Sequence, residues 1–121
     1  MTVRDVQIQK RLFEIIREGT GKTVLKSPPS ESSAPYVLGQ KISTTSIDQF
    51  IKLLQVKFEV VARTLSEANE IAADIIDLSD RLYDDNSLNL TGDAPELDGM
   101  MDDSQNGLFT VSFFIQIGYL G

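Results

Sequence analysis

FIKLLQVKFEVVARTLSEANEIAADIIDLSDRL (Phe50–Leu82) is the stretch of sequence that decides the fold. From Phe50 to Arg63, apolar and polar side chains alternate, which is the pattern of a strand with one buried face. From Ser66 to Leu82, apolar residues instead recur at spacings of three and four, which predicts an amphipathic helix. Ser66 is the predicted N-cap of this helix. A short link between the two elements lets the helix fold back over the apolar side of its own strand.

A second clear strand pattern lies near the end of the chain. Between Gly107 and Tyr119, apolar side chains alternate with mostly polar ones. Because both strands are long and each carries one apolar face, we expect them to pair. The other predicted elements are a helix at Thr2–Glu18 and short strands at Tyr36–Ser43 and Ser87–Thr91. This order predicts an α+β fold, a mostly antiparallel four-stranded sheet with two main helices packed on one face.

The predicted first helix has a broad apolar face. Val6, Phe13 and Ile16 lie along one side of it, and further apolar residues lie along the adjoining side. Thr2 can cap its N-terminus, and Gly19 is a suitable stop. The width of the face predicts burial against more than one neighbouring element.

The 121 residues are expected to form a single domain, spanning residues 1–121, with long loops at 21–35 and 92–106. The first loop is rich in proline and serine, which disfavours both helix and central strand. It is interpreted either as a mobile loop or as an arm that becomes ordered against a partner. The second loop is acidic and contains glycine, and is predicted to be irregular.

The residue types that the chain lacks restrict its chemistry. There is no cysteine and no histidine, which excludes disulfides, the usual zinc sites, thiol nucleophiles and imidazole catalysis. The N-terminus does not resemble a signal peptide, and no apolar run is long enough for a membrane helix. We therefore expect a soluble intracellular product without membrane contact. A carboxylate-based or lysine-based enzyme remains compatible with this composition.

Charge is unevenly distributed along the chain. The formal net charge is −7. Through Arg63 there are ten basic and six acidic residues, whereas from Thr64 onward one basic residue faces twelve acidic ones. Such a chain is a poor general nucleic-acid binder, because binding depends on cations at phosphates. The asymmetry is interpreted either as a solvated acidic surface or as complementary charge between neighbouring subunits.

Three motifs resemble ligand-binding or catalytic patterns without completing them. Gly19–Thr23 contains Gly-Lys-Thr, but the first glycine of a phosphate-binding loop is replaced by Ile16. Asp102–Gly107 resembles the start of a calcium loop, but Phe113 occupies the position of its bidentate glutamate. The acids between Asp74 and Asp85 lie off the apolar stripe of their helix and are expected to be exposed. The sequence therefore predicts no catalytic, cofactor-binding or metal-binding residue.

Five segments occur in a recognisable order. They are a Pro-Tyr-Val strand start at Pro35–Gly39, a strand end at Val61–Arg63, a helix start at Leu65–Ala72, a Leu-Asn-Leu segment at Leu88–Leu90 and a final strand start at Gly107–Phe113. In this order and spacing the chain resembles the bacteriophage tail terminator family, whose members are also called tail completion or head–tail joining proteins. The resemblance covers residues 34–119, and the order of the segments carries it.

The resemblance implies a structural virion protein without catalysis or cofactor. Such a protein forms a homohexameric ring at the top of the phage tail, terminates polymerisation of the tail tube and provides the surface for head–tail joining. The implied partners are further copies of the chain, the tail-tube protein and the connector or neck proteins. DNA is expected to pass through the ring without specific binding. The implied localisation is the virion, after assembly in the host cytoplasm.

Large loops carry recognition on such scaffolds, so the two long loops are the expected contact elements. Their candidate contact residues are Lys22, Lys26, Pro28, Pro29, Asp98, Asp102 and Asp103. The main alternative is another phage neck component, such as a head-completion or connector-adaptor protein. A small carboxylate-dependent enzyme or a monomeric binding module is less favoured. A deep pocket holding two acids with displaced pKa values would favour the enzyme.

Overall fold

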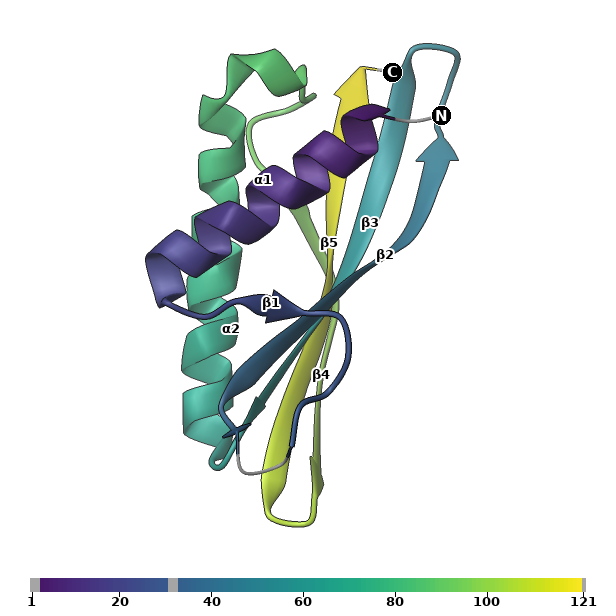
Figure 1. The fold of residues 1–121 in the computed structure, drawn as a ribbon. Coiled ribbons are helices and arrows are strands. Elements are labelled where there is room, and N and C mark those ends of the chain that lie inside the picture. Colours follow the sequence, from purple (N-terminus) through teal and green to yellow (C-terminus); the bar gives the residue numbers. More distant parts are fainter. Residues whose placement is uncertain (1–2, 31–32, 121) are drawn as a thin grey trace.

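The computed structural model describes residues 3–30 and 33–120, which fold into two α-helices and a five-stranded, mostly antiparallel sheet (Figure 1). In chain order the elements are α1 (Val3–Thr20), β1 (Val24–Leu25), β2 (Tyr36–Ser46), β3 (Ile51–Ala62), α2 (Leu65–Ser79), the 3-10 helices η2 (Asp80–Asp84) and η3 (Asn86–Leu88), β4 (Glu96–Gln105) and β5 (Leu108–Leu120). The predicted α+β class, with helices packed on the sheet, is confirmed.

The strands lie in the order β1-β2-β3-β5-β4. The expected pairing of the two long strands is confirmed, because β3 and β5 run antiparallel from Ile51 opposite Leu120 to Ala62 opposite Phe109. Antiparallel partners that lie directly opposite share a face, so the alternating apolar residues of both strands form one continuous surface. β1 pairs with β2 in parallel and forms one edge of the sheet, while β4 forms the other.

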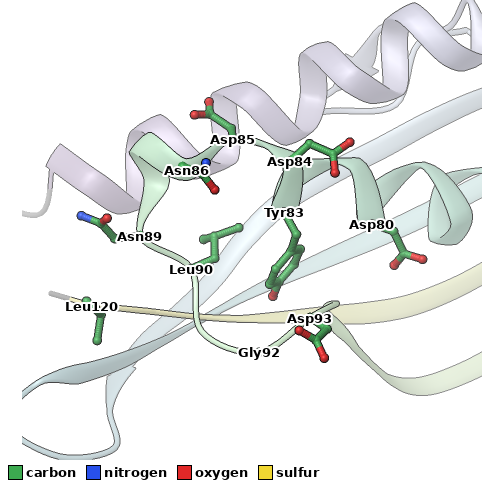
Figure 2. A pocket seen from close by; sticks show the side chains of 10 residues that line it. All are labelled: Asp80, Tyr83, Asp84, Asp85, Asn86, Asn89, Leu90, Gly92, Asp93 and Leu120. Carbon is green, nitrogen blue, oxygen red and sulfur yellow. The ribbon is translucent and has the colours of Figure 1, made fainter.

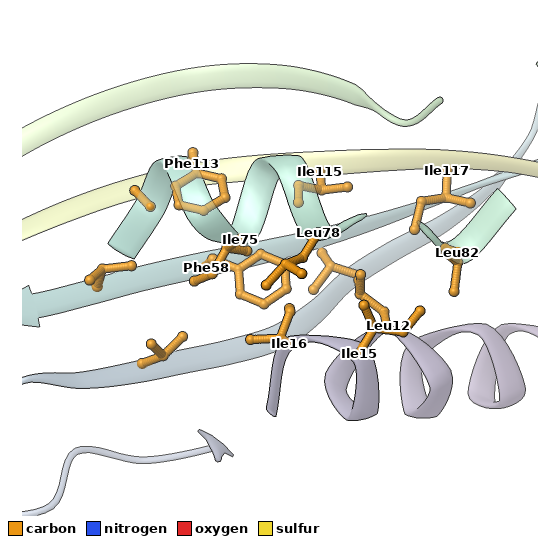
Figure 3. Packing of buried hydrophobic residues seen from close by; sticks show 14 of the residues in the cluster. Leu12, Ile15, Ile16, Phe58, Ile75, Leu78, Leu82, Phe113, Ile115 and Ile117 are labelled. Atoms are coloured by element: carbon orange, nitrogen blue, oxygen red, sulfur yellow. The ribbon is translucent and has the colours of Figure 1, made fainter. Parts of the chain in front are cut away.

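Both helices cover the same face of the sheet, and the apolar core lies between them and the strands (Figures 1 and 3). Phe58 lies in the middle of this core. Its ring centroid is 5.9 Å from that of Phe13 and 5.6 Å from that of Phe113. Burial of each large apolar side chain contributes about 1.5–3 kcal/mol. The core therefore fixes the two helices on one face and leaves the other face of the sheet without a helical cover.

Residues 92–106 were expected to form an irregular loop, and this prediction is wrong. Most of this segment is β4, which pairs antiparallel with β5 at the edge of the sheet. All its side chains are exposed, so the strand has no alternation of buried and exposed positions that a sequence pattern could reveal. Inside the other predicted loop, residues 21–35, Val24 and Leu25 form the short strand β1. The sheet consequently has five strands instead of four.

Several predicted boundaries also change. The N-cap of α2 is Thr64 and not Ser66, because the Thr64 hydroxyl accepts a hydrogen bond from the Glu67 amide at 3.1 Å. β2 extends to Ser46, which shortens the predicted polar turn before β3. Residues 87–91, a predicted strand, form part of η3 and a single bridge between Leu90 and Tyr119. The predicted cap at Thr2 lies outside the described residues.

The apolar face of α1 is narrower than the sequence suggested. Ile8, Leu12 and Ile16 are fully buried, but Val6 is 62% exposed and Phe13 only half-buried. The expected burial of Val6 is therefore wrong, because the side of α1 that carries it faces away from the sheet core. Among the described residues, the structure has no helix with the length and apolar character needed to cross a bilayer.

Candidate docking surfaces

The outer side of α1 and the strand β1 enclose a shallow apolar groove of about 600 Å³. We call it the α1–β1 groove. It is lined by Val6, Gln9, Lys10, Phe13, Glu14, Arg17, Thr23, Val24 and Lys26. The residues of α1 in this set lie at helical spacing and form one stripe along the helix, whereas Val24 and Lys26 come from β1 and the residues after it. The groove therefore depends on the parallel pairing of β1 with β2.

Positive charge borders the α1–β1 groove. Lys10, Arg17 and Lys26 form no ion pair with another of the residues that the structure describes. The groove's acid, Glu14, lies 3.4 Å from the guanidinium of Arg11. The groove thus combines apolar walls with cations that have no carboxylate partner in the described part of the chain.

The opposite edge of the sheet has the reverse charge. β4 is exposed along its whole length and contains Glu96, Asp98, Asp102 and Asp103 but no lysine or arginine. Three large apolar side chains on the same strand are also exposed: Leu97, Met100 and Met101. We call β4 the acidic edge. One side of it is free of any strand among the described residues, so its backbone groups there remain available to a partner.

A register shift divides the acidic edge between Asp98 and Met101. Gly99 lies in this irregular segment with φ +62°, a conformation that side chains other than glycine rarely adopt. Such a bulge bends the strand and changes the direction of its side chains. Met100 lies within this irregular segment and Met101 directly follows it.

The uncovered face of the sheet carries a second groove, of about 430 Å³. Pro28 and Pro29 line it together with Asp103 of β4. Its floor is formed by side chains of β2, β3 and β5: Tyr36, Leu38, Glu59, Val61, Leu108 and Thr110. The structure thus brings the two segments that were predicted as separate contact loops to one place. We call this the proline groove.

The other predicted contact residues are more dispersed. Asp98 and Asp103 lie opposite Phe114 and Thr110 on the uncovered face, whereas Asp102 lies opposite Val111 and belongs to the helix-covered face. Lys26 borders the α1–β1 groove. Lys22 is half-buried after α1, where its amide donates to the Thr20 hydroxyl at 3.1 Å, and lines neither groove.

The tip of the β2–β3 hairpin forms a further exposed apolar surface. Ile47 and Phe50 are 60% and 64% exposed. Leu120 lies directly opposite Ile51 in the register of β3 with β5 and is also exposed. The hairpin tip and the end of β5 lie at the same end of the elongated sheet, away from the β4–β5 turn (Figure 1). This end is therefore chemically distinct from both long edges.

A hollow rich in acids lies beside η2 (Figure 2). Asp80, Asp84, Asp85 and Asp93 line it. Burial, together with Asp80 and Glu96, raises the pKa of Tyr83 there to about 12. Hydrogen bonds from the Ser87 side chain and amide lower the pKa of the Asp85 carboxyl.

Among the described residues, no three or more acidic, histidine or cysteine side chains are arranged so that they could hold a metal ion together. In particular, the acids of this hollow do not converge on one position, because Asp85 already accepts from Ser87 and turns toward its own loop. Asp80 and Asp84 are exposed, as the sequence predicted, whereas Asp85 is half-buried.

The α1–β1 groove is the surface that sequence reasoning missed. Its signal was present, because Val6 and Phe13 share a helix stripe with Lys10 and Arg17, and a fully buried stripe would not include two cations. The stripe was assigned to the core because its contribution from β1 could not be foreseen. Val24 closes the groove only after β1 pairs with β2.

These features define a small α+β protein with differing surfaces at the two edges of its sheet. Comparison of the chain with protein-family models and with curated protein sequences finds no match.

Proposed function

We propose that this chain is a structural virion protein that forms a ring at the top of a phage tail. The ring terminates polymerisation of the tail tube and provides the surface to which the head joins. One observation carries the proposal: the edges of the sheet differ, with an apolar groove bordered by cations at one edge and an acidic, partly apolar strand at the other. A protein with two different complementary edges associates head to tail, and such association closes into rings when the rotation allows it.

The order of elements supports this proposal. The segments on which the resemblance to tail terminators depends correspond to β2, β3, α2 and β5, which form the centre of the structure. The segment 88–90 crosses from η3 to the bridge with Tyr119 at the edge of β5. A ring built on this scaffold would present the hairpin tip, with Ile47 and Phe50, on one of its two end surfaces.

The charge of the chain supports the passage of DNA through such a ring. The net charge of −7 and the exposed acids of β4 and α2 oppose binding of phosphates, because DNA binding gains affinity from cations that neutralise them. A lumen lined with part of these acids lets DNA slide without being held. In this proposal the partners are other copies of the chain, the tail-tube protein and the neck proteins.

The test is reconstitution with the tail-tube protein of the same phage. The purified chain is added to polymerising tube protein, and tube lengths and ends are followed by electron microscopy. We expect rings on one end of each tube and an arrest of growth at that end. Tubes that keep growing with unoccupied ends would overturn the proposal.

The same preparation separates the proposal from its main alternative. A head-completion or connector-adaptor protein would bind the portal or adaptor ring and leave tube growth unchanged. Co-sedimentation of the chain with the connector and without the tube is therefore the outcome that favours the neck component. A chain containing the Ile47→Ser and Phe50→Ser substitutions is a useful variant, because it alters an exposed end surface without touching the core.

A further inference from the structure

We propose that the acidic edge of one copy docks into the α1–β1 groove of the next copy. The contact rests on the proposed function, since it supplies the joint between neighbouring subunits of the ring. In this contact the α1–β1 groove, which sequence reasoning missed, forms one half of the joint, and the acidic edge forms the other.

Charge decides which pairing the acidic edge can make. Its four carboxylates, with no cation in the strand, oppose the symmetric pairing of β4 with β4 that an open edge strand otherwise favours. A symmetric contact would place Asp98, Asp102 and Asp103 of two copies against one another. The partner of β4 must therefore be a different surface, and the contact must be heterologous.

The α1–β1 groove has the charge that the acidic edge requires. Lys10, Arg17 and Lys26 border it and form no ion pair with any other residue in ranges 3–30 and 33–120. Opposite charges that meet across an interface accelerate association and fix the register of the partners. Lys10 and Arg17 lie about two turns apart on α1 and Lys26 directly follows β1, so cations are available on both walls of the groove.

Apolar surface is also matched between the two edges. Val6 is 62% exposed in the groove and Met101 is 67% exposed on the acidic edge. Phe13 also lines the groove, and Met100 is 49% exposed on the acidic edge. Methionine side chains adapt to irregular apolar surfaces, which suits a shallow groove without a deep pocket. Docking therefore removes from water apolar groups that both edges leave exposed.

The dimensions and positions of the two surfaces agree. Along α1, Val6 and Arg17 are separated by about 17 Å at the helical rise. Leu97 and Asp103 of β4 lie opposite Ile115 and Thr110, so this bulged stretch covers five residue steps of β5, or about 17 Å. The groove and the strand lie at opposite ends of the order β1-β2-β3-β5-β4, so one copy uses both surfaces at once without steric conflict. Repeating this contact around an axis builds a ring when the rotation between neighbouring copies closes.

Charge reversal tests the contact. In the first variant, Asp98→Lys, Asp102→Lys and Asp103→Lys make the edge basic. In the second, Lys10→Glu, Arg17→Glu and Lys26→Glu make the groove acidic. We expect each variant alone to remain monomeric under native mass spectrometry and sedimentation velocity, with the dissociation constant for self-association raised about 100-fold or more.

Mixing the two variants gives the sharper result. In a head-to-tail contact, the basic edge of the first variant fits the acidic groove of the second, and the acidic edge of the second fits the basic groove of the first. We expect a mixture to form alternating rings, and a single chain with all six substitutions to assemble alone. A control with Asp74→Lys and Asp77→Lys, two exposed acids of α2, should assemble as the unaltered chain does.

The outcomes separate this inference from the proposed function. Rings that form undiminished with the basic edge, or a mixture that stays monomeric although each variant keeps its fold by circular dichroism, would overturn the proposed contact and leave the proposed function standing. If rings form and depend on both edges but do not arrest tube growth, the contact holds and the proposed function fails. An unaltered chain that stays monomeric, both alone and with tubes, would overturn both.

Discussion

The ammonium nitrogen of Lys41, in β2, lies 3.0 Å from Oδ2 of Asp5 in the first turn of α1. The Asp5 side chain is 1% exposed and the Lys41 side chain 40% exposed, so a buried carboxylate is paired with a partly solvated ammonium group. The Thr44 hydroxyl donates to the same carboxylate oxygen at 2.9 Å. These contacts hold α1 on the β2 edge of the sheet, where its outer side forms the α1–β1 groove.

Replacement of Lys41 by methionine should destabilise the protein. The change keeps the aliphatic stem but removes a charged donor from a buried carboxylate, and the expected loss in unfolding free energy is about 2 kcal/mol. Urea unfolding measures it. The matched control is Lys57→Met, which breaks the half-exposed pair with Glu59 at 3.3 Å and should cost under about 1 kcal/mol. Equal losses in the two variants would contradict the structural role of the Lys41–Asp5 pair.

The start of α2 gives a second test. Because the Thr64 hydroxyl accepts from the Glu67 amide, Thr64→Ala should lower the unfolding free energy by about 1 kcal/mol. Ser66 was the cap expected from the sequence, yet it lies inside the helix. Ser66→Ala should therefore be close to neutral. Thermal unfolding followed by circular dichroism compares the two, and a larger loss for Ser66→Ala would refute the observed cap.

Gly118 of β5 and Thr91 meet closely at the edge of the sheet. A β-carbon at Gly118 would overlap the Thr91 hydroxyl oxygen, and the Thr91 amide donates to the Gly118 carbonyl at 2.8 Å. Gly118→Ala should cost about 1–3 kcal/mol through overpacking. The Thr91 β-carbon is 3.6 Å from that position, an ordinary contact.

Thr91→Ala should therefore recover most of the stability lost in Gly118→Ala. A double-mutant cycle by chemical denaturation measures this coupling. Thr91→Ala alone serves as the control and should change the unfolding free energy by less than about 0.5 kcal/mol. Strictly additive losses would show that the clash does not involve the hydroxyl.

Alkaline pH should weaken the fold through Tyr83. Its pKa is raised to about 12, first by burial and then by Asp80 and Glu96, from an ordinary value of 10.0. Above pH 10 the unfolded chain loses this proton more readily than the folded one, so the contribution to stability is complete below pH 10 and is lost as pH rises toward 12. Unfolding free energies measured across this range should fall.

The variant Tyr83→Phe isolates that effect. The unfolding free energy of this variant should fall less steeply between pH 10 and 12 than that of the unaltered chain. Tyr119 continues to contribute to the pH dependence of both proteins. Burial and the Asp5 carboxylate also raise the pKa of Tyr119. Identical pH profiles for the two proteins would contradict the perturbed phenol at Tyr83. Ultraviolet absorbance of the ionised phenol gives an independent titration.

Local sequence pattern determined the centre of the fold. In β3 and β5, and in α2, burial follows a repeat of two or of 3.6 residues at most positions, so Phe58, Phe113 and Ile75 could be assigned to the core. The pairing of β3 with β5 followed because two apolar faces of similar length had to be covered. Composition likewise excluded the chemistry of cysteine and histidine.

Tertiary structure alone decided the two edges. β4 is a strand because the backbone of β5 offers it hydrogen bonds, although its exposed acidic side chains have no strand periodicity. Val6 is exposed because α1 uses a different side to pack on the sheet, and β1 then closes a groove over that stripe. A buried face produces a periodic pattern of apolar residues in the local sequence. An exposed edge has no such pattern, because its position depends on segments that are distant in the sequence.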